Sequence, residues 1–388
     1  MRGLHAIAIV AALVGASSSA SAQGVTLPWG QSSDMVGWTE FARITAPSGQ
    51  AKKVEFETWA TDEDIYVKDP AVWPGINQPK ILQTSALARA HVERTARNAI
   101  RPFALAPNSC FKPQGLSGAA AGSGFPSNGC IGEEVRRNWA SFQYIVSNAL
   151  DTQAGRARAF ASGFRVDLPA DAIEFKGDWA SVATVADWLK VGADVVRKHY
   201  YTSTSTIGGV SVEIALLSFH ISTKQVKNWV WSDFEGTMTP GRCDVIGCHD
   251  SFGAVNTNVE PNDKPYQSYG DCAKTPALKA MLGSAGIDPV WFNYCMKGSQ
   301  VTFLDDNGAP ILLGNSIIEP LNANVPIARS SCLTCHAYAS FGADGNPTAA
   351  IGDMLNKPSD SPIGNVDPRI MQGSASNDFI WGLLTGGK

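Results

Sequence analysis

Three residues near the end of the 388-residue chain have the types and spacing needed to attach a cofactor covalently. Cys332, Cys335 and His336 form Cys-x-x-Cys-His within "SSCLTCHAYAS". In this spacing two thiols can form thioether bonds to haem, and the adjacent imidazole can coordinate the iron. A thioredoxin-like redox pair does not need the histidine, and a structural zinc site needs a second pair of ligands. The motif predicts one c-type haem, with two thioether cysteines and His336 as proximal iron ligand.

The opposite, distal face of the haem decides what such a protein does. Methionine or histidine on the iron there gives an electron carrier, whereas an open position admits a ligand or substrate. Met354 follows His336 by 18 residues and Met371 by 35, and the longer segment can cross more easily to the far face. His220 is a further candidate, because it ends an apolar, strand-like stretch. Met371, His220 and Met354 therefore all remain open as distal ligands.

A second segment, "CDVIGCH", contains Cys243, Cys248 and His249 in the spacing Cys-x4-Cys-His. Some multihaem cytochromes use this longer spacing. The surrounding residues are rich in turn formers, whereas attached haems usually lie where the motif enters a helix. We expect a disulfide loop here rather than a second haem.

The N-terminus has the layout of a secretory signal peptide over residues 1–22. A positive charge at Arg2 precedes an apolar run, and Ala20-Ser21-Ala22 forms a cleavage site before Gln23. No later stretch reaches 18 uninterrupted apolar residues, so we expect no integral membrane protein after cleavage. Because c-type haem is attached outside the cytoplasm, the two signals together predict an exported, most simply periplasmic, protein.

Six cysteines remain outside the haem motif, an even number that suits disulfides in an oxidising compartment. Cys110 and Cys130 bracket a loop rich in Gly and Ser, where a bridge would contribute roughly 3 kcal/mol through the unfolded state. The pairing among the others stays open. These are Cys243, Cys248, Cys272 and Cys295.

The chain is too long for one small cytochrome core, and its composition and hydrophobic pattern change along its length. Residues 23–163 are rich in tryptophan and partly helical, with helices expected over 81–100 and 131–150. Residues 164–320 are rich in β patterns, and 321–388 carry the haem motif. The predicted fold class is α+β: a helical and irregular N-terminal part, a β-rich central part with disulfides, and a C-terminal haem-binding segment.

Charge excludes one class of partner. The chain has 31 Lys and Arg against 35 Asp and Glu, and its basic residues are scattered rather than clustered. A nucleic-acid-binding surface would need a concentrated basic patch. The partners we expect are a redox protein or a small-molecule substrate.

The C-terminal half resembles a known group of proteins. "FHISTKQVKNWVWSDFE", "GSQVTF", "LGNSIIE" and "SSCLTCHAYAS" occur in that order and are similar to segments of large exported proteins of the cytochrome c family, whose function is uncharacterised. The resemblance covers about residues 200–388 and implies a monohaem c-type cytochrome without an established substrate. Where those proteins often have the sequence "TFEH", this chain has "DFEG". Gly236 therefore stands at the position of their histidine.

The layout, a β-rich body followed by a late haem motif, is also similar to hydroxylamine-oxidising cytochromes whose haem is cross-linked to a lysine. This analogy makes Lys176 and Lys224 the lysines of interest, although we expect both to be solvated.

These observations predict a periplasmic c-type haem protein that carries single electrons. The alternative is a haem-dependent oxidase or peroxidase that acts on a small molecule at an open distal face. The length of the chain, beyond what electron transfer requires, and the lack of a convincing distal methionine favour the alternative.

Overall fold

A computed structural model describes most of the chain. The described residues are 27, 31–49, 53–74, 122–126, 129–207, 210–262, 264–323, 325–348 and 361–382. The predicted signal peptide, the helix expected over 81–100, Cys110 and Met354 lie outside these residues.

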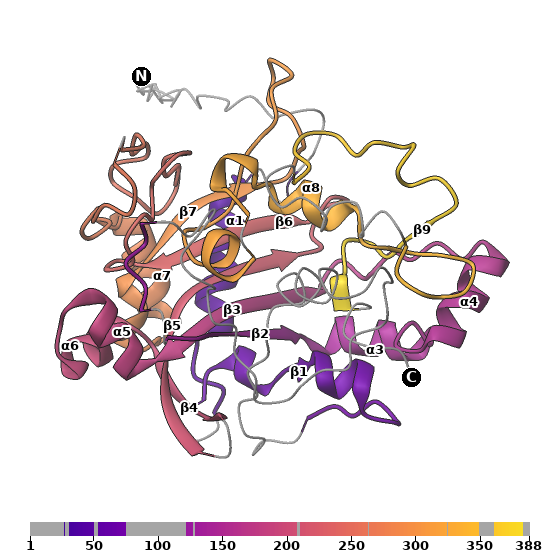
Figure 1. The fold of residues 1–388 in the computed structure, drawn as a ribbon, viewed down its shortest axis with the longest axis horizontal. Helices are drawn as coiled ribbons and strands as arrows, with labels where there is room; N and C mark the ends of the chain where they lie inside the picture. The colour runs from indigo at the N-terminus through magenta and orange to yellow at the C-terminus, as the bar shows by residue number, and fades with distance from the viewer. Residues whose placement is uncertain are drawn as a thin grey trace, which may run out of the picture.

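An antiparallel seven-stranded sheet runs through the middle of the molecule (Figure 1). Its path is β1-β2-β3-β5-β6-β7, and β4 pairs with the first half of β5. A second, two-stranded sheet joins β8 and β9. The strands are β1 (Ala60–Thr61), β2 (Ile131–Arg137), β3 (Ile173–Ser181), β4 (Thr202–Ile207), β5 (Val210–Thr223), β6 (Val230–Gly236), β7 (Tyr294–Gln300), β8 (Ser340–Phe341) and β9 (Ala375–Ser376).

Short helices surround the sheet, with α5 and α6 gathered at one end and α3 and α4 at the other (Figure 1). The α-helices are α1 (Ser33–Ile44), α3 (Trp139–Ser147), α4 (Gln153–Ser162), α5 (Val182–Leu189), α6 (Ala193–His199), α7 (Pro276–Ser284) and α8 (Cys332–Ala337). Tighter or wider turns are η3 (Glu55–Thr58), η4 (Glu63–Val67), η6 (Pro289–Asn293), η7 (Ile318–Asn322) and η8 (Ile327–Arg329).

One face of the large sheet is apolar and packs against α1 and α7. Alternate residues of β5, such as Phe219 and Ile221, point into this core, and Phe234 of β6 joins them. Helix α1 starts at Ser32, whose hydroxyl accepts the amide N–H of Met35. It brings Trp38 and Phe41 onto the sheet, so this face is closed by aromatic packing.

The other face carries two smaller cores. One lies beneath α5 and α6 and includes Val185 and Trp188. The second joins α3 and α4 to the segment of the predicted haem motif, through residues such as Phe142, Trp231 and Leu333. Helix α8 is thus packed onto the body of the protein, as expected if upstream residues build its surroundings.

The α+β prediction is confirmed, because helices accompany an antiparallel sheet. The helix predicted over residues 131–150 is wrong in its first half, where β2 occupies Ile131–Arg137 and only α3 is helical. Glu and Arg favour helices, but here they are held by cross-strand partners: Glu133 binds Lys176, and Arg137 binds Glu174. Tertiary pairing overrides local propensity.

The large sheet links two of the three regions expected from the sequence. Strands β1 and β2 come from residues 23–163, and the other strands of this sheet come from residues 164–320. Two disulfides, Cys243–Cys248 and Cys272–Cys295, decide the connectivity that the sequence left open. Cys130 is also disulfide-bonded.

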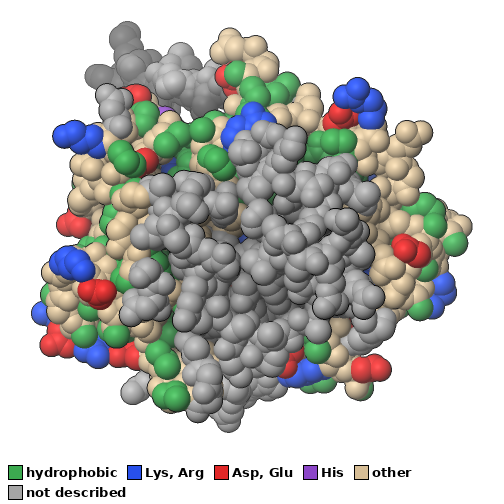
Figure 2. Space-filling view, in the orientation of Figure 1, with side chains coloured by type: hydrophobic (Ala, Val, Ile, Leu, Met, Phe, Trp, Pro, Cys, Tyr) green, Lys and Arg blue, Asp and Glu red, His purple; other side chains and the backbone are tan. Residues whose placement is uncertain are grey.

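The face seen in Figure 2 shows no concentration of one charge among its described residues. Around the rim of the face in Figure 2, acidic and basic side chains alternate with small hydrophobic groups. Within the described residues, no helix has both the length and the apolar character needed to cross a membrane.

The close contact between α1 and the sheet gives a stability prediction. A Cβ added at Gly37 would meet Ser232 and lie 2.7 Å from Cε of Met296, too close for either to stay in place. We expect Gly37→Ala to lower the free energy of unfolding by about 1–3 kcal/mol, measured by urea denaturation. Gly283→Ala in α7 is the control, because nothing lies within 4 Å of the added carbon and alanine favours the helix. Equal effects would contradict the packing argument.

Candidate functional site

The predicted attachment motif forms α8, a helix of six residues. Ser331 caps it and accepts the amide N–H of Thr334, so the helix begins at Cys332. Cys332 and Cys335 are three residues apart and therefore lie on one side of the helix. Both are free thiols, and Cys332 is buried while Cys335 is half-buried. A pair of reduced thiols on one helical face is what two thioether bonds require.

His336 is fixed in a defined orientation. Its Nδ1 lies 2.8 Å from the backbone oxygen of Phe379, and because a carbonyl can only accept, Nδ1 carries the proton. The lone pair is then on Nε2, which is the usual arrangement of a metal-binding histidine. Burial lowers the pKa of His336 to about 3, so the ring is neutral. Trp231 supports it, with ring centroids 4.4 Å apart.

The polar side of the sheet faces this helix. Lys176 of β3 pairs with His220 of β5, and His220 pairs with Asp233 of β6. Side chains directly opposite on neighbouring strands share a face, so these three titratable groups form one row across the sheet. Phe175 and Phe219, one residue earlier on the two inner strands, point to the apolar core instead. Strand alternation therefore creates the row.

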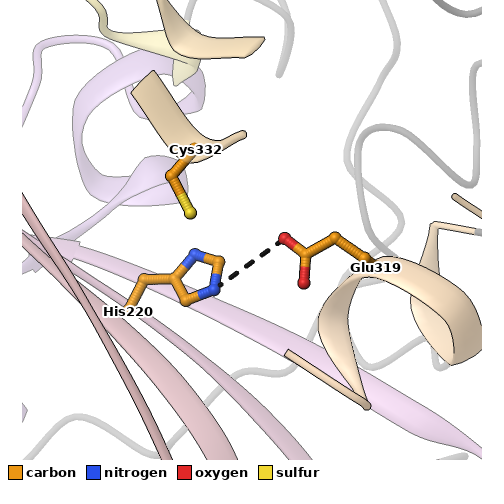
Figure 3. A group of neighbouring side chains, drawn as sticks. All are labelled: His220, Glu319 and Cys332. Atoms are coloured by element: carbon orange, nitrogen blue, oxygen red, sulfur yellow. Dashed lines mark ion pairs between the residues drawn. The ribbon is translucent and has the colours of Figure 1, made fainter. Parts of the chain in front are cut away.

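Glu319 approaches the row from the turn η7. Its Oε2 accepts the amide N–H of Asn315 at 2.6 Å, while Oε1 lies 3.9 Å from Nε2 of His220. Donor atoms of His220, Glu319 and Cys332 all lie within 4.8 Å of one another. Figure 3 shows the three side chains converging from strand, turn and helix. Burial raises the pKa of Glu319 to about 7.

The side chain of Asn315 contacts two members of this row, Asp233 and His220. Its side-chain N–H donates to Oδ1 of Asp233 at 3.0 Å and lies 3.3 Å from Nε2 of His220. Burial lowers the pKa of His220 well below its usual value and raises that of Asp233 well above its usual value. The imidazole is thus neutral, and the buried carboxyl favours its protonated form.

These groups surround one cavity of about 40 Å³, which is lined by Lys176, His220, Glu319, Cys332, Cys335 and His336. The donor set fits a covalent haem: two thiols on one helical face and an imidazole with Nε2 free and Nδ1 anchored. A cavity of this volume has room for water but is far smaller than a haem macrocycle, so haem binding would need the residues that line it to move apart.

The other predicted ligands lie elsewhere. Met371 is half-buried in a small cluster around Tyr338 and is not among the residues that line the cavity. Cys243 and Cys248 are bonded to each other, and both ring nitrogens of the exposed His249 lie within hydrogen-bond distance of nearby oxygens. Of the candidates that the structure describes, His220 is the one it brings to the motif.

The expectation that both lysines are solvated is wrong. Lys176 lines the cavity, and its Nζ lies 3.0 Å from Oε2 of Glu133. Lys224 is buried away from the cavity, with Asp378 and Asp167 at 2.6 and 3.0 Å. Carboxylates placed by strand pairing and by the C-terminal segment compensate the burial of each charge.

The chain matches no known family of proteins, and no curated protein or solved structure shows a significant similarity to it. The proposed function therefore rests on the geometry of the site.

The raised pKa of Glu319 predicts a pH-dependent stability. The folded chain binds this proton more tightly than the unfolded chain, so the stabilisation is present at low pH and is lost as the pH rises through about 7. We expect haem-free Glu319→Gln to gain stability relative to the haem-free wild type between about pH 5 and pH 8, measured by urea denaturation. The control is Glu213→Gln, because Arg197 lowers the pKa of that exposed carboxyl. Parallel curves for Glu319→Gln and wild type would contradict the prediction.

Proposed function

We propose that this chain is an exported c-type haem protein that carries out oxidoreductase chemistry on a small molecule at the sheet-facing side of its cavity. One observation carries the proposal: the thiols and imidazole of the attachment motif line the same cavity as His220 and Lys176 of the sheet. A simple thiol pair or an isolated surface motif would not need such surroundings. The two disulfides fit the oxidising compartment in which haem is attached.

The chain's own residues have distinct roles in this proposal. Cys332 and Cys335 hold the haem through thioether bonds, and His336 coordinates its iron through Nε2. When bound, the haem supplies a one-electron redox centre with an iron position that can be open or occupied. The backbone oxygen of Phe379 fixes the His336 ring by accepting a hydrogen bond from its Nδ1–H, and Trp231 packs against the ring.

The sheet-facing side offers groups that can hold and protonate a small molecule. Burial alone would lower the pKa of Lys176, but nearby carboxylates, Glu133 foremost, have the larger combined effect. The pKa is therefore raised, and the lysine stays cationic. His220 is neutral, and Glu319 titrates near neutral pH. A carboxyl with a pKa near 7 is suited to general acid–base catalysis. This combination supports an oxidase or peroxidase.

A single-electron carrier is the second candidate. His220 shares the cavity with His336, and no methionine is among the described residues that line it. If both imidazoles bound the iron, the centre would be closed to substrates and would exchange electrons with a redox partner protein.

Absorption spectra of the oxidised and reduced protein, with its intact mass, test the proposal. We expect the mass of one haem and a resting iron that binds cyanide. A mass without haem would overturn both candidates. A six-coordinate, low-spin iron that does not bind cyanide would leave only the electron carrier.

His220→Ala separates the two candidates further. If His220 acts as an acid–base group, the resting spectrum persists and turnover of the small molecule falls about 10²–10⁴-fold. If His220 is an axial ligand, the resting spectrum changes to that of an open iron. His249→Ala is the matched control, because this histidine is exposed and its ring contacts Ile246 and Asn258 rather than residues that line the cavity.

A further inference from the structure

We infer that the haem-free chain binds a zinc ion through His220, Glu319 and Cys332. This site does not depend on the haem proposal, because it uses the Cys332 thiol before any thioether has formed. It requires only one of the two cysteines of the motif. The other two ligands come from β5 and η7 rather than from α8.

The donor atoms are already close to a metal-binding arrangement. All three lie within 4.8 Å of one another (Figure 3). Zinc bonds to sulfur, nitrogen and oxygen are about 2.0–2.3 Å long, so tetrahedral donors are roughly 3.5 Å apart. Closing the site therefore needs movements of about 1 Å. The adjoining cavity of about 40 Å³ leaves room for a water as the fourth ligand.

Neighbouring groups orient two of the ligands. Glu319 uses Oε2 to accept the amide N–H of Asn315, which leaves Oε1 turned toward His220. Asn315 and Asp233 restrain the histidine ring, with Nδ2 and Oδ1 lying 3.3 and 3.7 Å from Nε2 of His220, the nitrogen that also faces Glu319. Such outer hydrogen bonds are typical of protein metal sites, because they fix the orientation of the coordinating side chains.

Charge also favours a divalent ion. Cys332 donates its S–H toward the backbone oxygen of Leu313 at 3.4 Å, and burial raises its thiol pKa. Zinc displaces such a proton when it binds. A thiolate and the Glu319 carboxylate carry two negative charges, which one Zn²⁺ neutralises. With the neutral His220, the loaded site has no net charge and is therefore compatible with burial.

Zinc and haem must compete for Cys332. A thioether sulfur no longer carries an ionisable proton and cannot act as a thiolate ligand. Zinc bound to Cys332 would also keep this thiol from pairing with Cys335 in an oxidising compartment. The inferred zinc site therefore belongs to the chain before haem is attached, when both thiols are free.

The test uses the full haem-free chain with reduced thiols and Co²⁺ as a spectroscopic probe. We expect a thiolate-to-cobalt charge-transfer band and the visible bands of a tetrahedral ion, both abolished by excess Zn²⁺. Cys332→Ser should abolish the charge-transfer band. His220→Gln and Glu319→Gln should weaken binding at least about tenfold.

Cys335→Ser is the matched control, because it removes the other free thiol of the same helix and should leave binding unchanged. Equal loss in both cysteine variants, or no binding to the folded wild type, would overturn the inference. X-ray absorption on the wild type needs no variant: one sulfur ligand supports the site, and two sulfurs refute it. Haem attachment uses both cysteines, so failure of the proposed function would be seen separately in the intact mass.

Discussion

Replacing Cys332 and Cys335 together by serine is expected to leave the purified protein with no covalently bound haem. The two sulfurs are free, three residues apart and on one side of α8, and they line the same cavity as His336. Serine keeps the size and polarity of the side chain but cannot form a thioether. Intact mass after denaturation measures the result, because a haem held by coordination alone is lost.

The second cysteine motif provides the control. Cys243 and Cys248 are joined by a disulfide and lie in a turn-rich loop, so replacing both by serine should leave the haem content unchanged. The stability of that variant should fall, since the bridge constrains the unfolded chain. If this second variant loses the haem while the first retains it, the attachment site has been assigned to the wrong segment.

The residues of the candidate site that belong to short sequence patterns could be predicted from the sequence alone. The predicted haem motif depends on spacing within five residues, and His220 is a candidate because it ends an apolar, strand-like stretch. The structure brings both to one cavity. Such features are visible because period-two alternation and short spacing are properties of the local chain.

Asp233 and Glu319 could not have been predicted in the same way. Asp233 is placed by the register of β6 against β5, and Glu319 lies in η7, which reaches the sheet after a long excursion of the chain. Asn315, which links them to His220, is 95 residues away from it in sequence. The polar residues of β6 are present in "VWSDFEG", but only the register of the strand shows which groups they face.

The helix predicted over residues 131–150 is wrong in its first half for a similar reason. The four charged residues in "IGEEVRR" favour helix on intrinsic propensity. The segment forms a nearly fully buried strand, because Glu133, Arg136 and Arg137 meet partners from distant parts of the chain. Long-range pairing of charges has no local signature, so sequence reasoning underestimates buried polar strands.

Arg137, at the end of this strand, is expected to be the most sensitive of these buried charges. Its side chain is 1% exposed and contacts Asp62 and, at 2.6 Å, Glu174. Both carboxylates are themselves buried. Arg137→Met would remove the arginine that both buried acids contact, and breaking a buried ion pair in this way costs about 3–5 kcal/mol. Urea denaturation at neutral pH measures the loss.

Two further variants show whether charge, rather than lost packing, causes the effect. In Arg137→Met combined with Asp62→Leu and Glu174→Met, no unpaired charge remains, and most of the stability should return. Arg197→Met breaks an exposed ion pair with Glu213 and should hardly change the urea midpoint. If the triple variant is as unstable as the single one, packing around Tyr66, over whose ring Arg137 lies, would be the cause.

The pH dependence of stability tests independently whether the charges beside Arg137 cause the effect. Burial raises the pKa of Glu174, and Arg137 opposes that rise, so its removal raises the pKa further. A carboxyl whose folded pKa is raised destabilises the protein above that pKa and ceases to do so when protonated. The stability deficit of Arg137→Met should therefore shrink as the pH falls from neutral toward the titration of Glu174. A deficit that is constant with pH would show that Asp62 and Glu174 are not left ionised, and that the arginine stabilises the sheet by contact rather than by charge.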